Sequence, residues 1–168
     1  LGGTDFDKKI CHLLNDKYKK ITGEYLFQED NFHKFLNAAE QIKRVLSSQE
    51  QASDVIDGPK GPQTIEISRG EFEESIEEYL DEIKMLVEDL MEQKELKPSD
   101  IDQILLVGGS TRMPVVVDCI KKIMGKEPTK GVDVDQAVAA GAAIYAGLNL
   151  PPEDLTVSQQ KVLANTKL

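Results

Sequence analysis

The stretch that most constrains the fold is a run of four apolar residues, Ile104–Val107, followed directly by Gly108–Gly109. Such a run predicts a buried strand that ends in a tight turn. Ser110 or Thr111 then offers an N-cap for a new helix, whose first turn tolerates Pro114. Glycines let a ligand approach the backbone, and the start of a helix favours anions. The residues alone therefore leave two interpretations, an ordinary corner between a strand and a helix or an anion-binding turn.

Composition narrows the class of protein. The 168 residues, 40% hydrophobic and 30% charged, suit one compact domain or two small lobes. Thirty acidic residues against twenty basic ones give a net charge of −10, which argues against nucleic acid or an anionic membrane as a partner. The longest weakly polar run, Ala137–Leu148, is too short to span a bilayer. The chain opens at Leu1 without an initiator Met, and we expect it to be a piece of a longer protein.

Cysteine and histidine give no sign of a metal site. Cys11 and Cys119 lie in helical patterns away from any Cys/His cluster, so we expect two free thiols. His12 and His33 have no ligand-like spacing to other residues, and we expect them to be surface or packing residues.

The first part of the chain predicts two helices. One is expected between Thr4, a candidate N-cap, and a stop at Thr22–Gly23. The second opens at residues 29–31 and carries an apolar stripe. Beside that stripe lies a polar one, spaced at i, i+3, i+4 and i+7 on one face: Glu40, Lys43, Arg44 and Ser47. By the residues alone, this polar stripe is a solvated face with an ion pair between Glu40 and Arg44.

The middle of the chain predicts a hairpin and a long helix. Two β-like runs, residues 52–57 and 63–68, enclose a loop with two prolines and two glycines, which is typical of a hairpin. Ser68 or Gly70 then starts the strongest helix of the chain. Its acidic face is expected to be solvated. Its apolar residues fall at alternating steps of four and three, which predicts one continuous buried seam: Phe72, Ile76, Tyr79, Ile83, Leu86 and Leu90.

The last third predicts two more helices. Residues 113–124 are expected to be helical, with Gly125 placed to end the helix. Asp135 is expected to cap residues 136–148, whose small side chains permit close packing on a sheet or a ligand. Pro151–Pro152 ends the folded region, and the tail to Leu168 is expected to be extended or weakly helical.

Five stretches together resemble the seventy-kilodalton heat-shock (DnaK-type) chaperones, in the second lobe of their ATPase domain. They are Leu1–Asp7, Glu40–Ser47, Ile67–Glu73, Ile104–Pro114 and Asp135–Ala143. The resemblance implies an α/β fold class, a fragment of the actin-like ATPase fold with a small mixed sheet, packed helices and a subdomain of helices and a hairpin. It also implies a chaperone, a heat-shock protein of the stress response, in the cytoplasm.

The resemblance implies an ATP/ADP site, with Mg in the intact parent domain. Glu40 and Lys43 match residues that bond the ribose hydroxyls, and Ser47 matches one that reads the adenine edge. Arg44 and Arg112 match two arginines whose guanidinium planes sandwich the adenine, which suits the stacking chemistry of arginine. The remaining matches lie along the sugar, the inner phosphates and the nucleoside: Gly108, Gly109, Ser110, Met113 and Asp135. For Asp135, a role as a helix N-cap explains the match equally well.

The resemblance also divides the chain and limits its chemistry. Residues 1–76 match the outer subdomain of the second lobe, residues 77–150 the C-terminal part of its inner subdomain, and residues 151–168 a tail or linker. The family's phosphate loops, catalytic lysine and magnesium-binding aspartates match nothing here, so we expect no catalytic residue, no metal ligand and no ATP hydrolysis by this chain alone. The parent is expected to be an ATPase.

Partners follow from the same resemblance. They are the nucleotide, a nucleotide-exchange factor, J-domain co-chaperones and the rest of the ATPase domain, with no nucleic acid and no membrane. Ile104–Val107 would carry an exposed sheet edge, which we expect a partner chain (including self-association) or the tail to cover. Two alternatives stay open: a non-enzymatic interaction module that uses the acidic helix, and a divergent actin-like or sugar-kinase-fold lobe.

Overall fold

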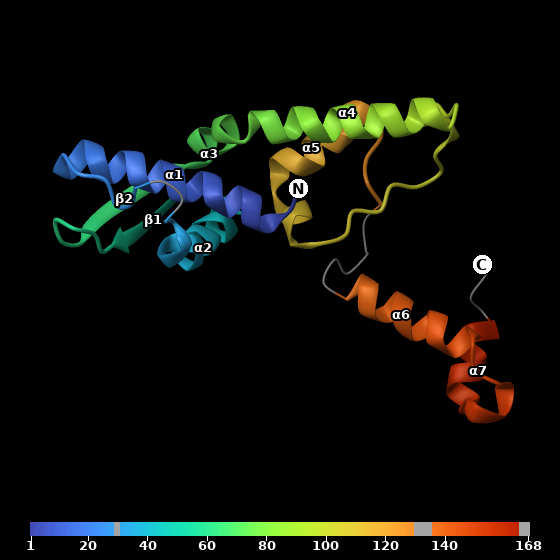
Figure 1. The fold of residues 1–168 in the computed structure, drawn as a ribbon. Helices are drawn as coiled ribbons and strands as arrows, with labels where there is room; N and C mark the ends of the chain where they lie inside the picture. The colour runs from blue at the N-terminus through green and yellow to red at the C-terminus, as the bar shows by residue number, and fades with distance from the viewer. Residues whose placement is uncertain (29–30, 130–135, 165–168) are drawn as a thin grey trace.

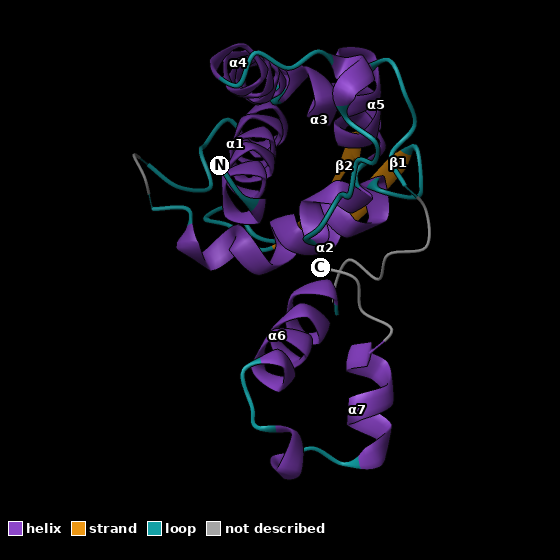
Figure 2. Ribbon diagram, turned by 90° about the vertical axis from the view of Figure 1, so that its right-hand side faces the viewer, coloured by secondary structure: helices purple, strands orange, loops and turns teal. Residues whose placement is uncertain are grey.

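The computed structural model describes residues 1–28, 31–129 and 136–164. In chain order the elements are α1 (Gly3–Thr22), η1 (His33–Phe35), α2 (Leu36–Leu46), β1 (Gln51–Ile56), β2 (Gln63–Ser68), α3 (Arg69–Ser75), α4 (Glu77–Gln93), η2 (Pro98–Asp100), η3 (Gly109–Arg112), α5 (Pro114–Met124), α6 (Ala137–Leu148), η4 (Pro152–Asp154) and α7 (Val157–Ala164). Helices α1 and α2 pack with the hairpin β1–β2, and α4 lies along α5 (Figure 1). Helices α6 and α7 contact each other and stand apart from the other helices (Figure 2).

Helix α1 forms where the sequence predicts a helix. It ends at Gly23, which adopts the left-handed conformation at φ 81° that glycine accepts without strain. Its N-cap is Gly2, so the expectation that Thr4 caps the helix is wrong. The Asp5 carboxylate accepts a hydrogen bond from the Gly2 N–H at 2.9 Å and thereby satisfies one donor at the helix start. The buried face of α1 packs against α2 and β2.

Helix α2 begins after a single 3₁₀ turn, η1, rather than directly after residues 29–31. Residues 29 and 30 lie outside the described residues. The predicted apolar stripe of α2 is buried through Ala39, Ile42 and Leu46. The predicted polar stripe lies beside this apolar face, with Arg44 exposed and Lys43 turned toward α1, so the amphipathic pattern of the sequence orients the helix correctly.

The predicted hairpin is confirmed. Strands β1 and β2 pair antiparallel, with Ala52 opposite Ile67 and Ile56 opposite Gln63. Alternation along each strand buries one face of the hairpin against the helices, through Ala52, Ile56, Ile65 and Ile67.

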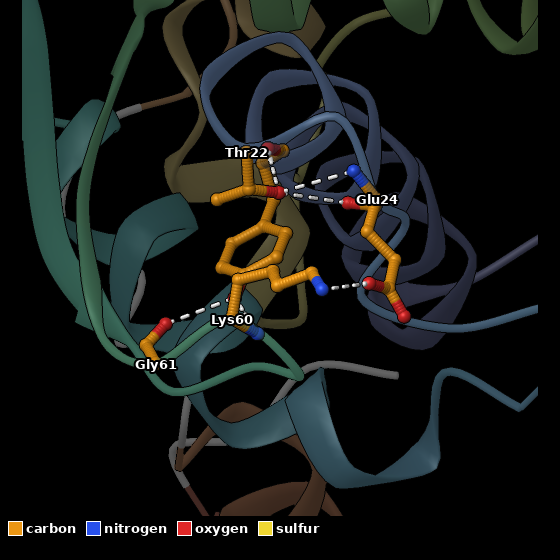
Figure 3. Close-up of polar contacts among 5 residues, drawn as sticks. Thr22, Glu24, Lys60 and Gly61 are labelled. Atoms are coloured by element: carbon orange, nitrogen blue, oxygen red, sulfur yellow. Dashed lines mark hydrogen bonds and ion pairs between the residues drawn. The ribbon is translucent and has the colours of Figure 1, made fainter.

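The tip of the hairpin is fastened to the end of α1 by Tyr18. The Tyr18 hydroxyl donates to the Gly61 carbonyl at 2.9 Å and accepts from the Lys60 N–H at 2.8 Å. Figure 3 shows Lys60 also reaching Glu24, with a Lys60 Nζ–Glu24 Oε2 distance of 3.2 Å. In the same view, Thr22 Oγ1 accepts from the Glu24 N–H at 3.2 Å and so shapes the turn that follows α1.

The predicted long helix is two helices, α3 and α4, with a break at Ile76. Ser68 caps α3, because its Oγ accepts from the Glu71 N–H at 3.2 Å while the Glu71 carboxylate accepts from the Ser68 N–H at 2.9 Å. At the start of α4, Lys9 of α1 pairs with Glu78 at 2.5 Å and lies 5.1 Å from the centre of the Tyr79 ring.

The expectation of one continuous buried seam along this helix is wrong. Phe72 and Ile76 are buried, but Leu86 and Leu90 are more than half exposed. The periodicity is helical throughout, but only the part of the helix that lies over the core finds a surface to cover. Among the described residues, nothing buries the end of α4.

The stretch Ile104–Val107 is not a strand, which corrects the first expectation drawn from the sequence. A strand needs a neighbour for its N–H and C=O groups, and within the described residues the sheet holds only β1 and β2. The stretch runs as extended chain, tied at one point by the Thr129 N–H donating to the Ile104 carbonyl at 2.7 Å. Leu105 and Val107 are exposed, and no ladder forms with the described part of the tail, residues 151–164.

Helices α5 and α6 match their predictions to different degrees. Helix α5 ends at Gly125, which adopts φ 65°, as expected. Helix α6 is present, but none of its residues is buried, so within the described residues its small side chains do not pack on a sheet; packing on a ligand stays a prediction. Its apolar contact is with α7, where Leu163 approaches Gly147. The expected cap Asp135 lies outside the described residues.

The described residues therefore form a mixed structure of helices with a two-stranded antiparallel sheet, and the predicted small mixed sheet is not present among them. The core gathers buried residues of α1, α2, both strands and α3, and Met113 and Val116 also belong to it. Both cysteines are free, as expected. None of the helices in the described ranges has the length and apolar character needed to cross a bilayer.

Candidate functional site

The candidate site is a cavity of about 670 Å³ that opens between two stretches distant in the sequence. One wall is the polar stripe of α2, and the other is the turn that contains η3. The start of α1 lies between them. The lining residues are Gly3, Thr4, Asp7, Glu40, Lys43, Arg44, Ser47, Gly109, Ser110, Arg112 and Met113.

The start of α1 forms the floor of the cavity. Gly3 brings the two walls close together, because a Cβ added to it would lie 3.4 Å from Lys43 Nζ and 3.7 Å from Ser110 Oγ. One turn further along α1, the carboxylate of Asp7 points toward the same lysine. Asp7 is the buried charged residue of the described chain, with 8% of its surface exposed.

The α2 wall presents alternating charges. The Lys43 ammonium lies 2.7 Å from Asp7 Oδ1 and donates to the Gly3 carbonyl at 3.0 Å. Arg44 lies on the outer side, paired with Glu40 at 2.8 Å, and two thirds of its side chain is exposed. The Glu40–Arg44 ion pair expected for a solvated face is therefore present, but both residues also line the cavity.

The opposite wall is a tight turn. Gly108 adopts φ 98°, a conformation that other residues avoid, and its carbonyl accepts from Thr111 Oγ1 at 2.6 Å. The turn continues as η3 into α5, whose N-cap is Met113 and whose first residue is Pro114. Pro114 thus stands where the sequence predicts, while the expectation that Ser110 or Thr111 caps this helix is wrong.

Met113 anchors the turn to the protein. Its side chain is buried with the core that includes α1 and α2, while it also lines the cavity. Arg112, the neighbouring residue, is exposed at the rim. Met113 therefore fixes the position of the turn relative to α2, although the extended chain before the turn is not part of a sheet.

The cavity carries more positive than negative charge, in a chain of net charge −10. Lys43, Arg44 and Arg112 line it together with the carboxylates of Asp7 and Glu40. A partly enclosed polar space of this size suits a small ligand with hydroxyls and an anionic group. Among the described residues no group of three or more Asp, Glu, His or Cys side chains is arranged to hold a metal ion.

The structure brings together most of the residues that the resemblance points to. Eight of them line the cavity: Glu40, Lys43, Arg44, Ser47, Gly109, Ser110, Arg112 and Met113. Gly108 lies directly before the lining residues and shapes their turn, and Asp135 falls outside the described residues.

Three lining residues were not predicted as site residues: Gly3, Thr4 and Asp7. The signal for Asp7 is visible in the sequence. It lies on the same helical face as Ile10, Cys11, Leu14 and Tyr18, all of which are buried, so a carboxylate stands at the end of an apolar stripe. A charge in such a place needs a partner.

Comparison with known proteins gives a consistent result. The family model described as "Hsp70 protein" matches residues 1–163. The chain is 40% identical over 156 residues to "Heat shock 70 kDa protein 7, chloroplastic" of Arabidopsis thaliana, covering 88% of this chain and 22% of that protein. It is 38% identical to "Chaperone protein dnaK" of Emiliania huxleyi and to "Stromal 70 kDa heat shock-related protein, chloroplastic" of Spinacia oleracea, covering 88% of this chain and 25% and 26% of theirs.

The comparisons correct one expectation and support another. The relatives from Arabidopsis thaliana and Spinacia oleracea are named as chloroplastic, which overturns the expected cytoplasmic location. The chain spans about a quarter of the length of the curated relatives it matches. The family model nevertheless matches nearly all of its residues, as the five stretches implied, and the chain belongs to the Hsp70 family.

Proposed function

We propose that the cavity binds the adenosine half of ATP or ADP, and that the chain is the second lobe of the actin-like ATPase domain of a chaperone. The observation that carries this proposal is the meeting of the α2 stripe and the η3 turn at one cavity, with an arginine from each. A planar base fits between two guanidinium groups, which stack on π-faces and carry charge that suits nearby phosphates.

The roles within the cavity follow from the chemistry of each side chain. Lys43 donates to, and Glu40 accepts from, the ribose hydroxyls, and Ser47 meets the edge of the base. Arg44 and Arg112 hold the two faces of the adenine. The turn beside the sugar and inner phosphates is Gly108, Gly109 and Ser110, with Met113 as its anchor and Asp135 near the nucleoside.

The proposal extends to the parent protein. In this lobe residues 1–76 are its outer subdomain, residues 77–150 are the C-terminal part of its inner subdomain, and residues 151–168 are a tail or linker. The parent hydrolyses ATP with Mg, using groups that match nothing in this chain, and works with an exchange factor and J-domain co-chaperones in a plastid. The exposed apolar residues of α4 and of residues 104–107 then face the rest of the ATPase domain.

Calorimetric titration of the 168-residue chain with ADP tests the proposal. Arg44→Ala and Arg112→Ala should each weaken ADP binding by roughly tenfold, because each removes one stacking face. Arg44→Lys, which keeps the charge and loses the plane, should recover little of the loss. Lys122→Ala is the control, because it removes a positive charge from an exposed position on α5 that does not line the cavity.

Two outcomes would overturn the proposal. One is the absence of ADP binding by the wild-type chain, both alone and when it is joined to the preceding part of the ATPase domain of a relative. The other is ADP binding that neither arginine substitution weakens beyond the Lys122→Ala control.

One observation favours a second candidate function, a protein-interaction module. Helix α4 exposes Met85, Leu86 and Leu90 among acidic side chains, which suits a basic amphipathic segment. Replacing Leu86 and Leu90 by Ser should then abolish capture of such a peptide, while ADP binding stays unchanged. Unchanged peptide capture by this variant would exclude the second function.

A further inference from the structure

A carboxylate stands inside the core at the edge of the cavity. Asp7 lies one turn before Ile10 and Cys11 on the buried face of α1, and only 8% of its surface is exposed. Burying a carboxylate is unfavourable unless it has a partner, so its position requires an explanation. Capping α1 is not the explanation, because Asp5 fills that role with the Gly2 N–H.

The partner of Asp7 is Lys43. Its ammonium lies 2.7 Å from Asp7 Oδ1, and both side chains are nearly buried, at 11% and 12% exposure. Oδ1 is enclosed by protein atoms and accepts no hydrogen bond of good geometry from the described residues, so the ion pair is the contact that compensates its charge. The Gly3 carbonyl holds the same ammonium from a second direction, at 3.0 Å.

The two contacts fix where the ammonium can point. A lysine head has three donors on a flexible stem, and an exposed one samples many positions. The Lys43 ammonium cannot do so, because the Gly3 carbonyl and the Asp7 carboxylate of α1 both bind it. The remaining donor capacity is directed at the cavity that Lys43 lines.

From this geometry we infer that Asp7 is a positioning residue, which holds Lys43 in place to donate to a ligand hydroxyl and neutralises its charge. The inference rests on the proposed function, in which that hydroxyl belongs to the ribose. Because the Lys43 charge is balanced at 2.7 Å, this end of the cavity selects a neutral hydroxyl over a phosphate. The inner phosphates then lie beside the turn at Gly109 and Ser110, as in the proposed function.

The test compares ADP with 2′,3′-dideoxy-ADP, which lacks the ribose hydroxyls. Both are titrated into the 168-residue chain, as wild type and as Asp7→Asn. The wild type should prefer ADP by roughly tenfold, because charge-assisted hydrogen bonds are worth about that much. Asp7→Asn should remove most of this preference by weakening ADP, while binding of the dideoxy analogue is not weakened. A purely structural role for Asp7 would weaken both ligands equally.

The matched control is Asp16→Asn, the same change of charge at an exposed position of α1. It should keep the full preference for ADP. Thermal unfolding of each variant verifies that it is folded. If Asp7→Asn does not fold, Asp7→Glu replaces it, because it keeps the charge but displaces the carboxylate by one methylene, and the preference should again fall.

The outcomes separate the two proposals. If the wild type binds neither ligand, the adenosine site itself is refuted and the role of Asp7 with it. If the wild type prefers ADP and a folded Asp7 variant keeps that preference, only the positioning role is refuted.

Discussion

Gly3 and Ser110 face each other closely across the floor of the cavity, although one belongs to the first turn of α1 and the other to η3. A Cβ added to Gly3 would lie 3.7 Å from Ser110 Oγ and 3.4 Å from Lys43 Nζ. Those distances are ordinary van der Waals contacts, so the protein accepts the methyl group but the cavity loses the space it fills.

Gly3→Ala should therefore separate stability from binding. Alanine favours a helix over glycine by up to about 1 kcal/mol, so the melting temperature should stay the same or rise. ADP affinity should fall by about 1 kcal/mol, because the added methyl crowds the ligand. Calorimetry and thermal unfolding measure the two effects. Gly70→Ala on α3, where an added Cβ meets nothing within 4 Å, is the control and should leave ADP binding unchanged.

Glu71 should make the stability of the chain depend on pH in acid. Its bond from Lys17 at 2.6 Å and those from Ser68 lower the pKa of the carboxyl from 4.5 to about 2. A group with a lowered folded-state pKa stabilises the fold above its unfolded pKa, and this stability is lost as the pH falls from 4.5 toward 2. Because Glu71 is 43% exposed, solvent screening limits the effect to about 1 kcal/mol.

Glu71→Gln tests this expectation. The unfolding free energy of the variant should be lower at neutral pH and should change less between pH 5 and pH 2, measured by urea denaturation across that range. Glu74→Gln, at an exposed position of the same helix, is the control. Equal pH dependence in both variants would contradict the assigned role of Glu71.

The two thiols should differ in reactivity. Burial raises the pKa of Cys11 to about 12, and Asp7 adds to the shift, so a reactive thiolate is absent from the folded protein near neutral pH. Burial also raises the pKa of Cys119, but that residue is only half-buried on α5. Iodoacetamide should label Cys119 first and Cys11 only after unfolding, as peptide mass spectrometry of Cys11→Ser and Cys119→Ser would show. Equal labelling rates in native buffer would refute this.

Tyr18→Phe should loosen the hairpin tip. The substitution leaves the Lys60 N–H without its acceptor and the Gly61 carbonyl without its donor, at a cost of about 1–3 kcal/mol. Hydrogen exchange at the Lys60 amide should accelerate accordingly. Tyr25→Phe, which removes an exposed hydroxyl bonded to Lys19, should have little effect. Protection of Lys60 that survives the loss of the Tyr18 hydroxyl would count against this clamp.

The apolar residues before and after the break at Ile76 should contribute unequally to the free energy of unfolding. Ile76→Ala should cost about 2–5 kcal/mol of unfolding free energy, because the side chain is fully buried. Leu90→Ala should cost less than about 0.5 kcal/mol, because Leu90 is exposed in this chain. Similar losses in the two variants would mean that α4 is covered along its whole length.

Local features of the fold were predictable because their causes are local. Gly23 and Gly125 end their helices where the sequence places them, and the loop between residues 57 and 63 turns the hairpin. The strand expected at Ile104–Val107 could not be judged in this way. An apolar run becomes a strand only if a neighbouring strand pairs with its N–H and C=O groups, and that neighbour can lie far away in the sequence.

The candidate site shows the same division. The α2 stripe is visible by its spacing, but the residues alone identify it as a solvated face, since the pairing of Glu40 with Arg44 looks the same in either case. That the stripe and Arg112 line one cavity depends on long-range packing, in which Met113 joins the core formed with α2. Asp7 was detectable by its place on an apolar face, but its partner Lys43 was not, because the crossing of α1 and α2 fixes the pair.

Helix α1 has a mechanical consequence for the protein. It is unbroken from Gly3 to Thr22. Near one end Asp7 pairs with Lys43 of the cavity wall, and near the other Tyr18 is hydrogen-bonded to the hairpin tip. With the rise per residue of an α-helix, Asp7 and Tyr18 lie about 16 Å apart along one rigid helix. If α1 tilted by about 10° around its cavity end, the Tyr18 end and the hairpin tip bonded to it would be displaced by roughly 3 Å. The cavity wall and the hairpin tip are therefore joined by one rigid element, and a tilt of α1 at one end would displace the other.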